Sequence, residues 1–264
     1  MRKEGQCKLT LEYGKFIKSH LIPQALTKPE VRGGIMKQIG EGSHPKKATS
    51  SWYDYELVIR QGEDILTEFD TAAINILRTN QLIWGGWEQQ FNSADSTFHI
   101  IDNNYGVREF SNLDWKNLRL FALSLLWRAC NTTQNGFCEV SIPKNDLEKI
   151  RLLLVNRDAG AIHFYPIKFC QLSTKGKIHN QTPFIRKFEL PKRCEVTRSR
   201  HLNIVRFYFD GLVMHIHLSK TLRQIKGFDH QILGLDPQSF IVPTVTYEVS
   251  FQRENLENIL DLYE

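Results

Sequence analysis

The order of hydrophobic and polar residues divides the chain into a helical part and a β-rich part. From position 63 to position 77, apolar side chains recur with the spacing of one helix face, behind two acidic residues that suit the positive end of a helix dipole. The segment 111–114 is typical of a helix start, and the run that follows it to Cys130 is apolar on nearly all sides apart from Arg128. These patterns predict one amphipathic helix and one helix buried in the core.

Two shorter helices are predicted, one after Pro143 with Asn145 as its cap and one over residues 255–263. The segment 28–51 is rich in Gly, Pro, Lys and Ser, which favours a loop. Residues 52–59 follow it with the aromatic and branched side chains of a strand.

From Ala161 onwards the pattern is that of β-strands, first at 162–165 and 167–172. The dipeptide Asp210-Gly211 separates two apolar runs and predicts a hairpin with a type I′ turn. Pro243 confines the strand predicted within 240–251 to a sheet edge, or delays its start. The hairpin register would pair Phe209 with Leu212, Phe207 with Met214 and Val205 with Ile216 on one face, and Arg206 with His215 on the other.

Together these elements predict an α+β protein in two parts. Residues 1–80 would form an N-terminal hairpin-and-helix module, and residues 81–264 a helical core with a mostly antiparallel C-terminal sheet. No apolar run is long enough to cross a bilayer, no secretory signal is visible, and the five cysteines lack C-x-x-C spacing. The sequence therefore predicts a cytoplasmic protein with free thiols and no membrane partner.

The positive charge is concentrated in two segments. The net charge of the whole chain is only +5, but residues 1–50 hold 10 Lys/Arg against 4 Asp/Glu, and residues 174–200 hold 8 against 2. Residues 54–70, between them, hold 1 against 6. Such segments form either solvated faces or a surface that binds phosphate, and the sequence leaves both interpretations open.

A nucleic-acid interface is one hypothesis for these basic segments, because lysine and arginine neutralise phosphates and interleaved aromatic rings can stack on bases. A basic sheet edge that prevents strand-to-strand aggregation would explain the same pattern near Phe184 and Phe188. The candidate nucleic-acid-binding residues are Lys46, Lys47, Lys175, Lys177, Arg186, Lys187, Lys192, Arg193, Arg198 and Arg200.

Four N-terminal segments follow one another in a characteristic order. They are Cys7-Lys8-Leu9-Thr10, Ser19-His20-Leu21-Ile22-Pro23, Trp52-Tyr53-Asp54 and Val58-Ile59-Arg60-Gln61-Gly62-Glu63. This order resembles bacterial proteins with an N-terminal HNH-type treble-clef zinc or nuclease module. Those proteins carry a C-x-x-C pair, a Ser-His-Ile-Ile-Pro-like string, a Trp/Tyr-Asp strand, and a second C-x-x-C pair before a helix. The string 123–128 is also similar, which extends the resemblance to about residue 155.

The resemblance implies four soft zinc ligands, of which only Cys7 is present. Thr10 replaces the second cysteine, and residues 52–63 contain none, so a structural zinc is not expected. In HNH-type nucleases a histidine activates water and a divalent metal stabilises the phosphate, which implies His20 as general base. Otherwise His20 is a structural remnant. The implied metal, Mg²⁺ or Mn²⁺, would take oxygen ligands from among Asp54, Glu63 and Asp70.

Three functions remain open at this point. The first is a nuclease-derived subunit that binds nucleic acid or regulates a partner, in a prokaryotic defence or mobile-element system. The second is a metal-dependent DNA or RNA endonuclease that uses His20. The third is a protein-interaction component without nucleic-acid contact. The loss of the cysteines favours the first.

Overall fold

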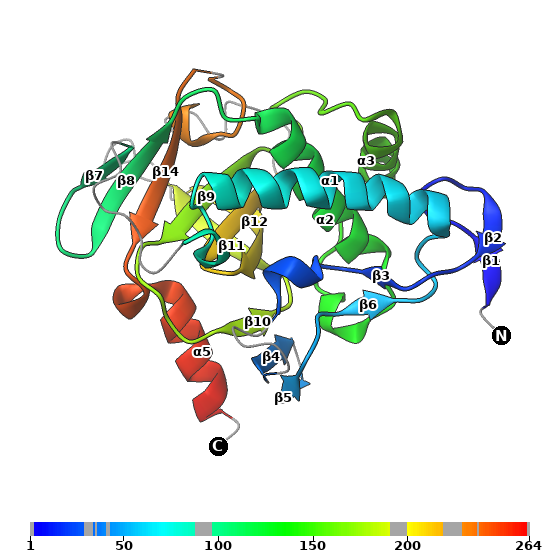
Figure 1. Ribbon diagram of the computed structural model, residues 1–264, viewed down its shortest axis with the longest axis horizontal. Helices are drawn as coiled ribbons and strands as arrows, with labels where there is room; N and C mark the ends of the chain where they lie inside the picture. The colour runs from blue at the N-terminus through cyan, green and yellow to red at the C-terminus, as the bar shows by residue number, and fades with distance from the viewer. Residues whose placement is uncertain are drawn as a thin grey trace.

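The chain folds around a seven-stranded mixed sheet that carries its two long helices against one face (Figure 1). This computed structural model describes residues 3–28, 34, 36–40, 43–87, 97–190, 200–218, 229–236 and 238–262. The sheet order is β11-β12-β13-β9-β14-β8-β7, and among these strands only β14 and β9 run parallel to each other. The bounds are Phe98–Ile100 (β7), Tyr105–Phe110 (β8), Ile167–Leu172 (β9), Phe184–Leu190 (β11), Arg200–Phe209 (β12), Leu212–His217 (β13) and Phe240–Val245 (β14). The predicted α+β class is confirmed.

The two long helices form where the hydrophobic pattern predicts them. Helix α1 spans Arg60–Thr79 and buries one face, whereas α2 spans Trp115–Asn131 and is buried from Leu118 to Ala129. Asp114 caps α2, because its carboxylate accepts a hydrogen bond from the backbone N–H of Asn117 at 3.2 Å. Among the described residues, no helix is long and apolar enough to cross a membrane.

The two shorter helices are displaced from their predicted starts. Helix α3 spans Lys144–Asn156 and begins directly after Pro143, so Asn145 lies inside the helix and the predicted cap is wrong. Proline is compatible with this position because the first turn needs no N–H donor there. Helix α5 spans Phe251–Asp261, with the hydroxyl of Ser250 accepting from the N–H of Arg253.

One hydrophobic core joins the N-terminal segments to the sheet. It runs from Cys7 through α1 and α2 to the inner faces of β9, β12, β13 and β14. The rings of Phe121 on α2 and Phe209 on β12 meet edge to face, with centroids 6.0 Å apart. Residues 1–80 and 81–264 therefore share this core.

The Asp210-Gly211 hairpin has the predicted register. Phe209 pairs with Leu212 across the turn, and the other predicted pairs follow in step. Asp210 and Gly211 have φ angles of 50° and 79°, the left-handed geometry of a type I′ turn. Pro243, by contrast, lies in an interior strand, so its predicted edge position is wrong. The start of β14 is not delayed either, because the strand begins at Phe240 and pairs with β8 through Pro243. Its pairing with β9 begins after the proline, at Thr244.

The segment 162–165 forms turns instead of the predicted strand. Arg119, fully buried on α2, donates hydrogen bonds to the carbonyl oxygens of Ala159, Ala161, Phe164 and Tyr165. These carbonyls therefore have a partner without a sheet ladder. Burial lowers the pKa of Arg119 to about 10.

The segment 28–51, predicted as a loop, contains two strands. β4 (Met36–Gly40) pairs antiparallel with β5 (Ser43–Ala48) and parallel with β10 (His179–Gln181). The parallel partner comes from a distant part of the sequence, so no local signal announces it. Two further pairs complete the N-terminal region: β1 (Glu4–Gln6) with β2 (Tyr13–Lys15), and β3 (Ser19–His20) with β6 (Tyr53–Asp54).

Candidate functional site

His20 lies in the short β3–β6 pair, opposite Tyr53. Its Nε2 atom is buried and has no hydrogen-bond partner. Burial lowers the pKa of His20 from its ordinary value, and the charges of Lys18 and Arg128 lower it further. The Nε2 atom is therefore out of contact with solvent in this conformation.

Asp70 on α1 forms a buried ion pair with Arg128 on α2. Nη1 of Arg128 donates to Oδ2 of Asp70 at 3.0 Å, and Nη2 donates to Oδ1 of the same carboxylate. The guanidinium also donates to the carbonyl oxygen of His20 at 2.9 Å and to Oγ of Ser124 at 2.8 Å. Both oxygens of Asp70 are thus occupied by an arginine that is 1% exposed.

Asp54 and Glu63 complete the residues predicted as metal ligands. Asp54 accepts hydrogen bonds from the backbone of Glu56 and Thr133 and from the hydroxyl of Thr132, so it fixes two loops. Burial raises the pKa of Glu63, whose Oε2 has no partner. In the part of the chain that the structure describes, no group of three or more His, Cys, Asp or Glu side chains could hold a metal ion. The predicted set Asp54, Glu63 and Asp70 is therefore not assembled as a metal centre.

Cys7 sits in a tight turn that packs against the start of α1. Its Sγ accepts the backbone N–H of Thr10 at 3.4 Å, and its carbonyl accepts the N–H of Leu11 at 3.0 Å. A side chain at Gly62 would place its Cβ only 2.8 Å from Cys7 Sγ. The two segments that the resemblance aligns with cysteine pairs therefore touch, with a thiol packed on a glycine.

A hollow of about 320 Å³ opens at the C-terminal end of α1, and we call it the cationic hollow. Lys28, Arg78 and Lys175 line it together with one carboxylate, Asp210. Burial raises the pKa of Asp210 from its ordinary value, although the N–H of Gly85, at 2.9 Å, and the three cations oppose that shift. The other lining residues are Ala25, Leu26, Trp84, Gly85, Trp87, Gly176, Ile178, His179, Asn180 and Tyr208.

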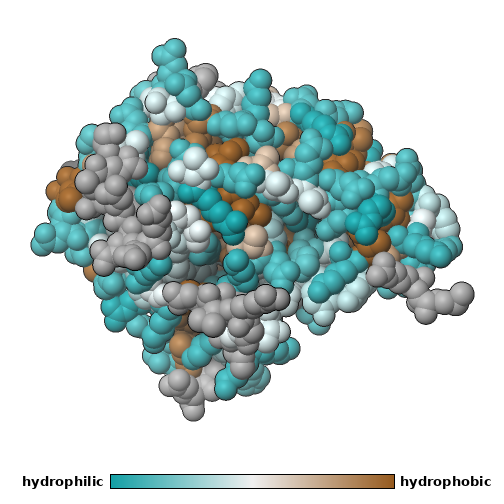
Figure 2. Space-filling view, viewed as in Figure 1, coloured by the Kyte–Doolittle hydropathy of each residue, from teal (hydrophilic) through white to brown (hydrophobic). Residues whose placement is uncertain are grey.

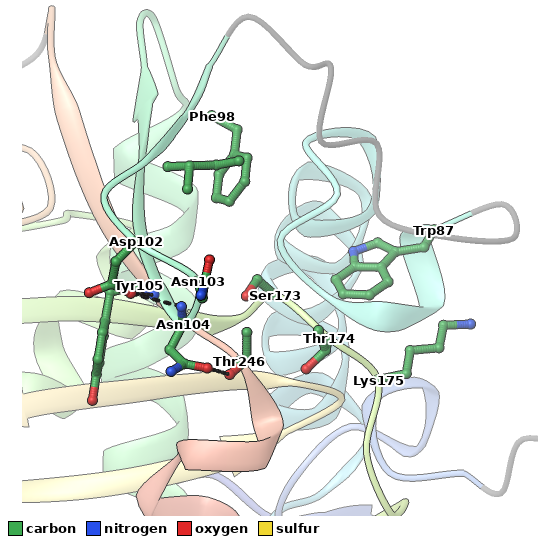
Figure 3. A pocket seen from close by; sticks show the side chains of 11 residues that line it. Trp87, Phe98, Asp102, Asn103, Asn104, Tyr105, Ser173, Thr174, Lys175 and Thr246 are labelled. Atoms are coloured by element: carbon green, nitrogen blue, oxygen red, sulfur yellow. Dashed lines mark hydrogen bonds between the residues drawn. The ribbon is translucent and has the colours of Figure 1, made fainter.

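A second hollow of about 650 Å³ adjoins the first and shares Trp87 and Lys175 with it; we call it the apolar hollow. Figure 3 shows Phe98 and Trp87 on opposite sides of it, with polar side chains along its base. The remaining lining residues are Ile100, Asp102, Asn103, Asn104, Tyr105, Ser173, Thr174 and Thr246. The two hollows together present rings, amides and positive charge on one connected surface.

The structure brings only part of the predicted basic set into this surface. Lys175 lines both hollows, and Lys177 is exposed two residues further along the same segment. Lys46 and Lys47 are exposed on β5, which belongs to the sheet formed with β10. On β11, at the edge of the large sheet, Lys187 is exposed and Arg186 is partly buried over the ring of Phe251 at 3.7 Å. Lys192, Arg193 and Arg198 lie outside the described residues, and of Arg200 only the backbone, at the start of β12, is described.

Sequence reasoning missed most residues of the two hollows. The Trp84–Trp87 segment is a turn whose two tryptophans are buried, and it also lines the hollows. Arg78 belongs to the last turn of a helix, where arginine is common, and Lys28 lies in a bend after the short helix Gln24–Leu26. Nothing local marks either residue as a ligand.

A second basic cluster lies on the sheet face opposite the core. Nη1 of Arg206 lies 3.3 Å from Nε2 of His215, and Nη2 donates to Gln252 of α5 at 3.3 Å. His217 is 2% exposed, and neither ring nitrogen has a hydrogen-bond partner. Burial lowers the pKa of His217 to about 4. His215 and His217 do point to the same side of β13, but no metal group forms there among the described residues.

Comparisons of the chain with protein-family models, with curated proteins and with solved structures find no significant match.

Proposed function

We propose that the protein binds nucleic acid through the cationic hollow and acts as a non-catalytic or regulatory subunit derived from a nuclease. The observation that carries this proposal is the convergence of Lys28, Arg78 and Lys175 around a single carboxylate. These cations come from three separate segments, and with three cations against one carboxylate the hollow carries an excess of positive charge that attracts anions. Phosphate is the anion that a lysine and arginine cluster beside aromatic rings suits best.

The nuclease ancestry is supported by the contact between the Cys7 turn and Gly62. In the resembling family both segments would carry zinc ligands, and here a packed thiol replaces the metal. Helix α1 and the aromatic residues Trp52 and Phe137, whose rings meet at 5.7 Å, supply packing in the same region. The proposed defence or mobile-element role rests on the resemblance alone.

We propose that the protein is not a nuclease because the residues predicted to act in catalysis and metal binding are buried or already make other hydrogen bonds. Arg128 occupies both oxygens of Asp70, Asp54 holds two loops, and Nε2 of His20 does not contact solvent. A general base must come within hydrogen-bond reach of the water that it activates. In the described conformation, Nε2 of His20 lacks that access.

The test is the salt dependence of binding, measured by fluorescence anisotropy with a labelled oligonucleotide. Wild type should show a linear fall of log affinity with log salt, and Lys28→Ala/Lys175→Ala should bind at least roughly tenfold more weakly. For single strands the double substitution should reduce the slope by about 1.4, because each lost phosphate contact removes about 0.7.

The matched control is Lys116→Ala/Lys144→Ala, which removes two exposed lysines from the starts of α2 and α3. If the control weakens binding as much as the hollow variant, only net charge matters and the cationic hollow is not the site. Incubation of wild type and His20→Ala with Mg²⁺ or Mn²⁺ and the same oligonucleotide completes the test. Cleavage by the wild type alone would overturn the non-catalytic part of the proposal.

A further inference from the structure

We infer that the apolar hollow receives an unstacked base of a single-stranded nucleic acid whose phosphates lie in the cationic hollow. This inference rests on the proposed function and adds the class of ligand, because only a single strand has a free base to insert. The two hollows adjoin at Trp87 and Lys175, so one nucleotide can present its base to the apolar hollow and its phosphate to the cationic hollow.

The size and lining of the apolar hollow suit a flat aromatic ligand. A volume of about 650 Å³ falls within the range of small-molecule sites, which are mostly apolar with a few polar groups. Phe98 is partly exposed and Tyr105 is 50% exposed, so both offer ring surface. Trp87 is 7% exposed, and its Nε1 donates to the carbonyl of Gln81 at 2.9 Å, so it forms a fixed wall. Rings of this kind stack on bases without regard to sequence.

Polar groups along the base of the hollow remain available to the edge of a ligand. Asp102 holds the turn by accepting the N–H groups of Asn104 and Tyr105 at 2.7 Å and 2.9 Å. Oδ1 of Asn104 accepts from the hydroxyl of Thr246 at 3.1 Å, which leaves its amide NH₂ for a ligand. Asn103 is exposed beside it (Figure 3). Amide side chains can donate to and accept from base edges.

The surface around the hollow is also apolar where a soluble protein would ordinarily be polar. Ile100 and Ile101 are 68% and 67% exposed at the tip of the β7–β8 hairpin. Figure 2 shows an apolar patch at the left edge of the molecule, where Figure 1 places β7 and β8. An exposed apolar patch beside a hollow marks a binding surface, and the neighbouring cations select a negatively charged ligand.

The experiment compares a single-stranded oligonucleotide of about 12 nucleotides with a duplex of the same sequence, by anisotropy at one salt concentration. Wild type should prefer the single strand. Phe98→Ala should weaken single-strand binding by roughly 5- to 100-fold, the range for loss of one stacked base, and should leave duplex binding unchanged. Phe98→Tyr keeps a ring and should retain the preference. Asn103→Ala, at an exposed position that tolerates change, should weaken binding of the single strand by a smaller factor than Phe98→Ala does.

Phe184→Ala is the matched control, because Phe184 is a partly exposed phenylalanine on β11, the opposite edge strand of the sheet. It should bind both ligands as wild type does. Equal single-strand binding by Phe98→Ala and wild type, with binding lost in Lys28→Ala/Lys175→Ala, would overturn this inference and leave the proposed function intact. No binding of either ligand by folded wild type would overturn both and point to a protein partner for the exposed apolar surface.

Discussion

The substitution Asp70→Ala tests whether the polar cluster beside His20 serves stability. Asp70 supplies the carboxylate that neutralises Arg128, and the arginine side chain is 1% exposed. Without that carboxylate the guanidinium stays buried with only Ser124 Oγ and the carbonyls of His20 and Ser124 as acceptors. A buried charge whose partner is removed destabilises a protein by roughly 3–5 kcal/mol.

The lower end of that range applies here, because Asp70 is 17% exposed and water can approach the vacated position. We therefore expect a loss of about 3 kcal/mol in the free energy of unfolding. For a chain of this size, such a loss corresponds to a fall in Tm of roughly 6–12 °C. Adding Arg128→Met to Asp70→Ala removes the unpaired charge, so the double variant should lose about 1–3 kcal/mol less than the sum of the two single variants.

Urea unfolding followed by circular dichroism measures the free energy of unfolding of the single variants and of the double variant. The control is Asp64→Ala on the same helix, because the Asp64 side chain is 64% exposed and lies 3.9 Å from Arg60 in a solvent-facing pair. Exposed pairs of this kind contribute little, so the control should change stability by less than about 0.5 kcal/mol. If Asp70→Ala and Asp64→Ala lower the free energy of unfolding by the same amount, burial of Arg128 does not require the Asp70 carboxylate. The structural role assigned to this ion pair is then wrong.

Two further predictions concern titration and packing. Burial lowers the pKa values of His179 and His217 to about 4, below their ordinary value of 6.5, and it lowers those of His20 and His215 as well, so the unfolded chain binds more protons than the folded chain below pH 6.5. Stability should therefore decrease as pH falls, with His179 and His217 each contributing about 2 kcal/mol between pH 7 and pH 5 in urea titrations, and His217→Gln should reduce the decrease by about 2 kcal/mol. Gly62→Ala places a methyl group 2.8 Å from Cys7 Sγ and should cost about 1–3 kcal/mol by the same measurement. Cys7→Ala in the same chain should relieve part of that cost, and an additive result would contradict the contact.

Local signals in the sequence predicted the elements that depend on neighbouring residues. The 3.6-residue period of α1, the apolar run of α2 and the Asp210-Gly211 turn each depend on residues close in sequence. One partner of β4 could not be predicted in this way, because β10 lies far away in the chain. The pairing of β4 with β5 is local, but the Gly, Pro, Lys and Ser content of this segment favoured a loop. The turns at 162–165 escaped prediction for a similar reason, since Arg119 on a distant helix satisfies their carbonyls.

The candidate site was predictable only in its charge. Lys175 was identified because it belongs to a basic segment, and that reasoning needs composition alone. Arg78 and Phe98 become part of the same surface only after the sheet and α1 pack together. The resemblance directed attention to His20 and Asp70, whose residue types suit catalysis, but residue type does not reveal that Arg128 already occupies the carboxylate.

Helix α1 connects the buried polar cluster to the proposed binding surface. Gly62 packs on Cys7 near its start, Asp70 binds Arg128 at its middle, and Arg78 enters the cationic hollow at its end. Asp70 and Arg78 are eight residues apart, which corresponds to about 12 Å along a rigid helix. Contacts that fix the first half of the helix therefore also fix the position of the last arginine. On this reasoning the N-terminal module would support the proposed binding without contacting the ligand near His20, because it holds α1 in the register that places Arg78 in the same hollow as Lys175.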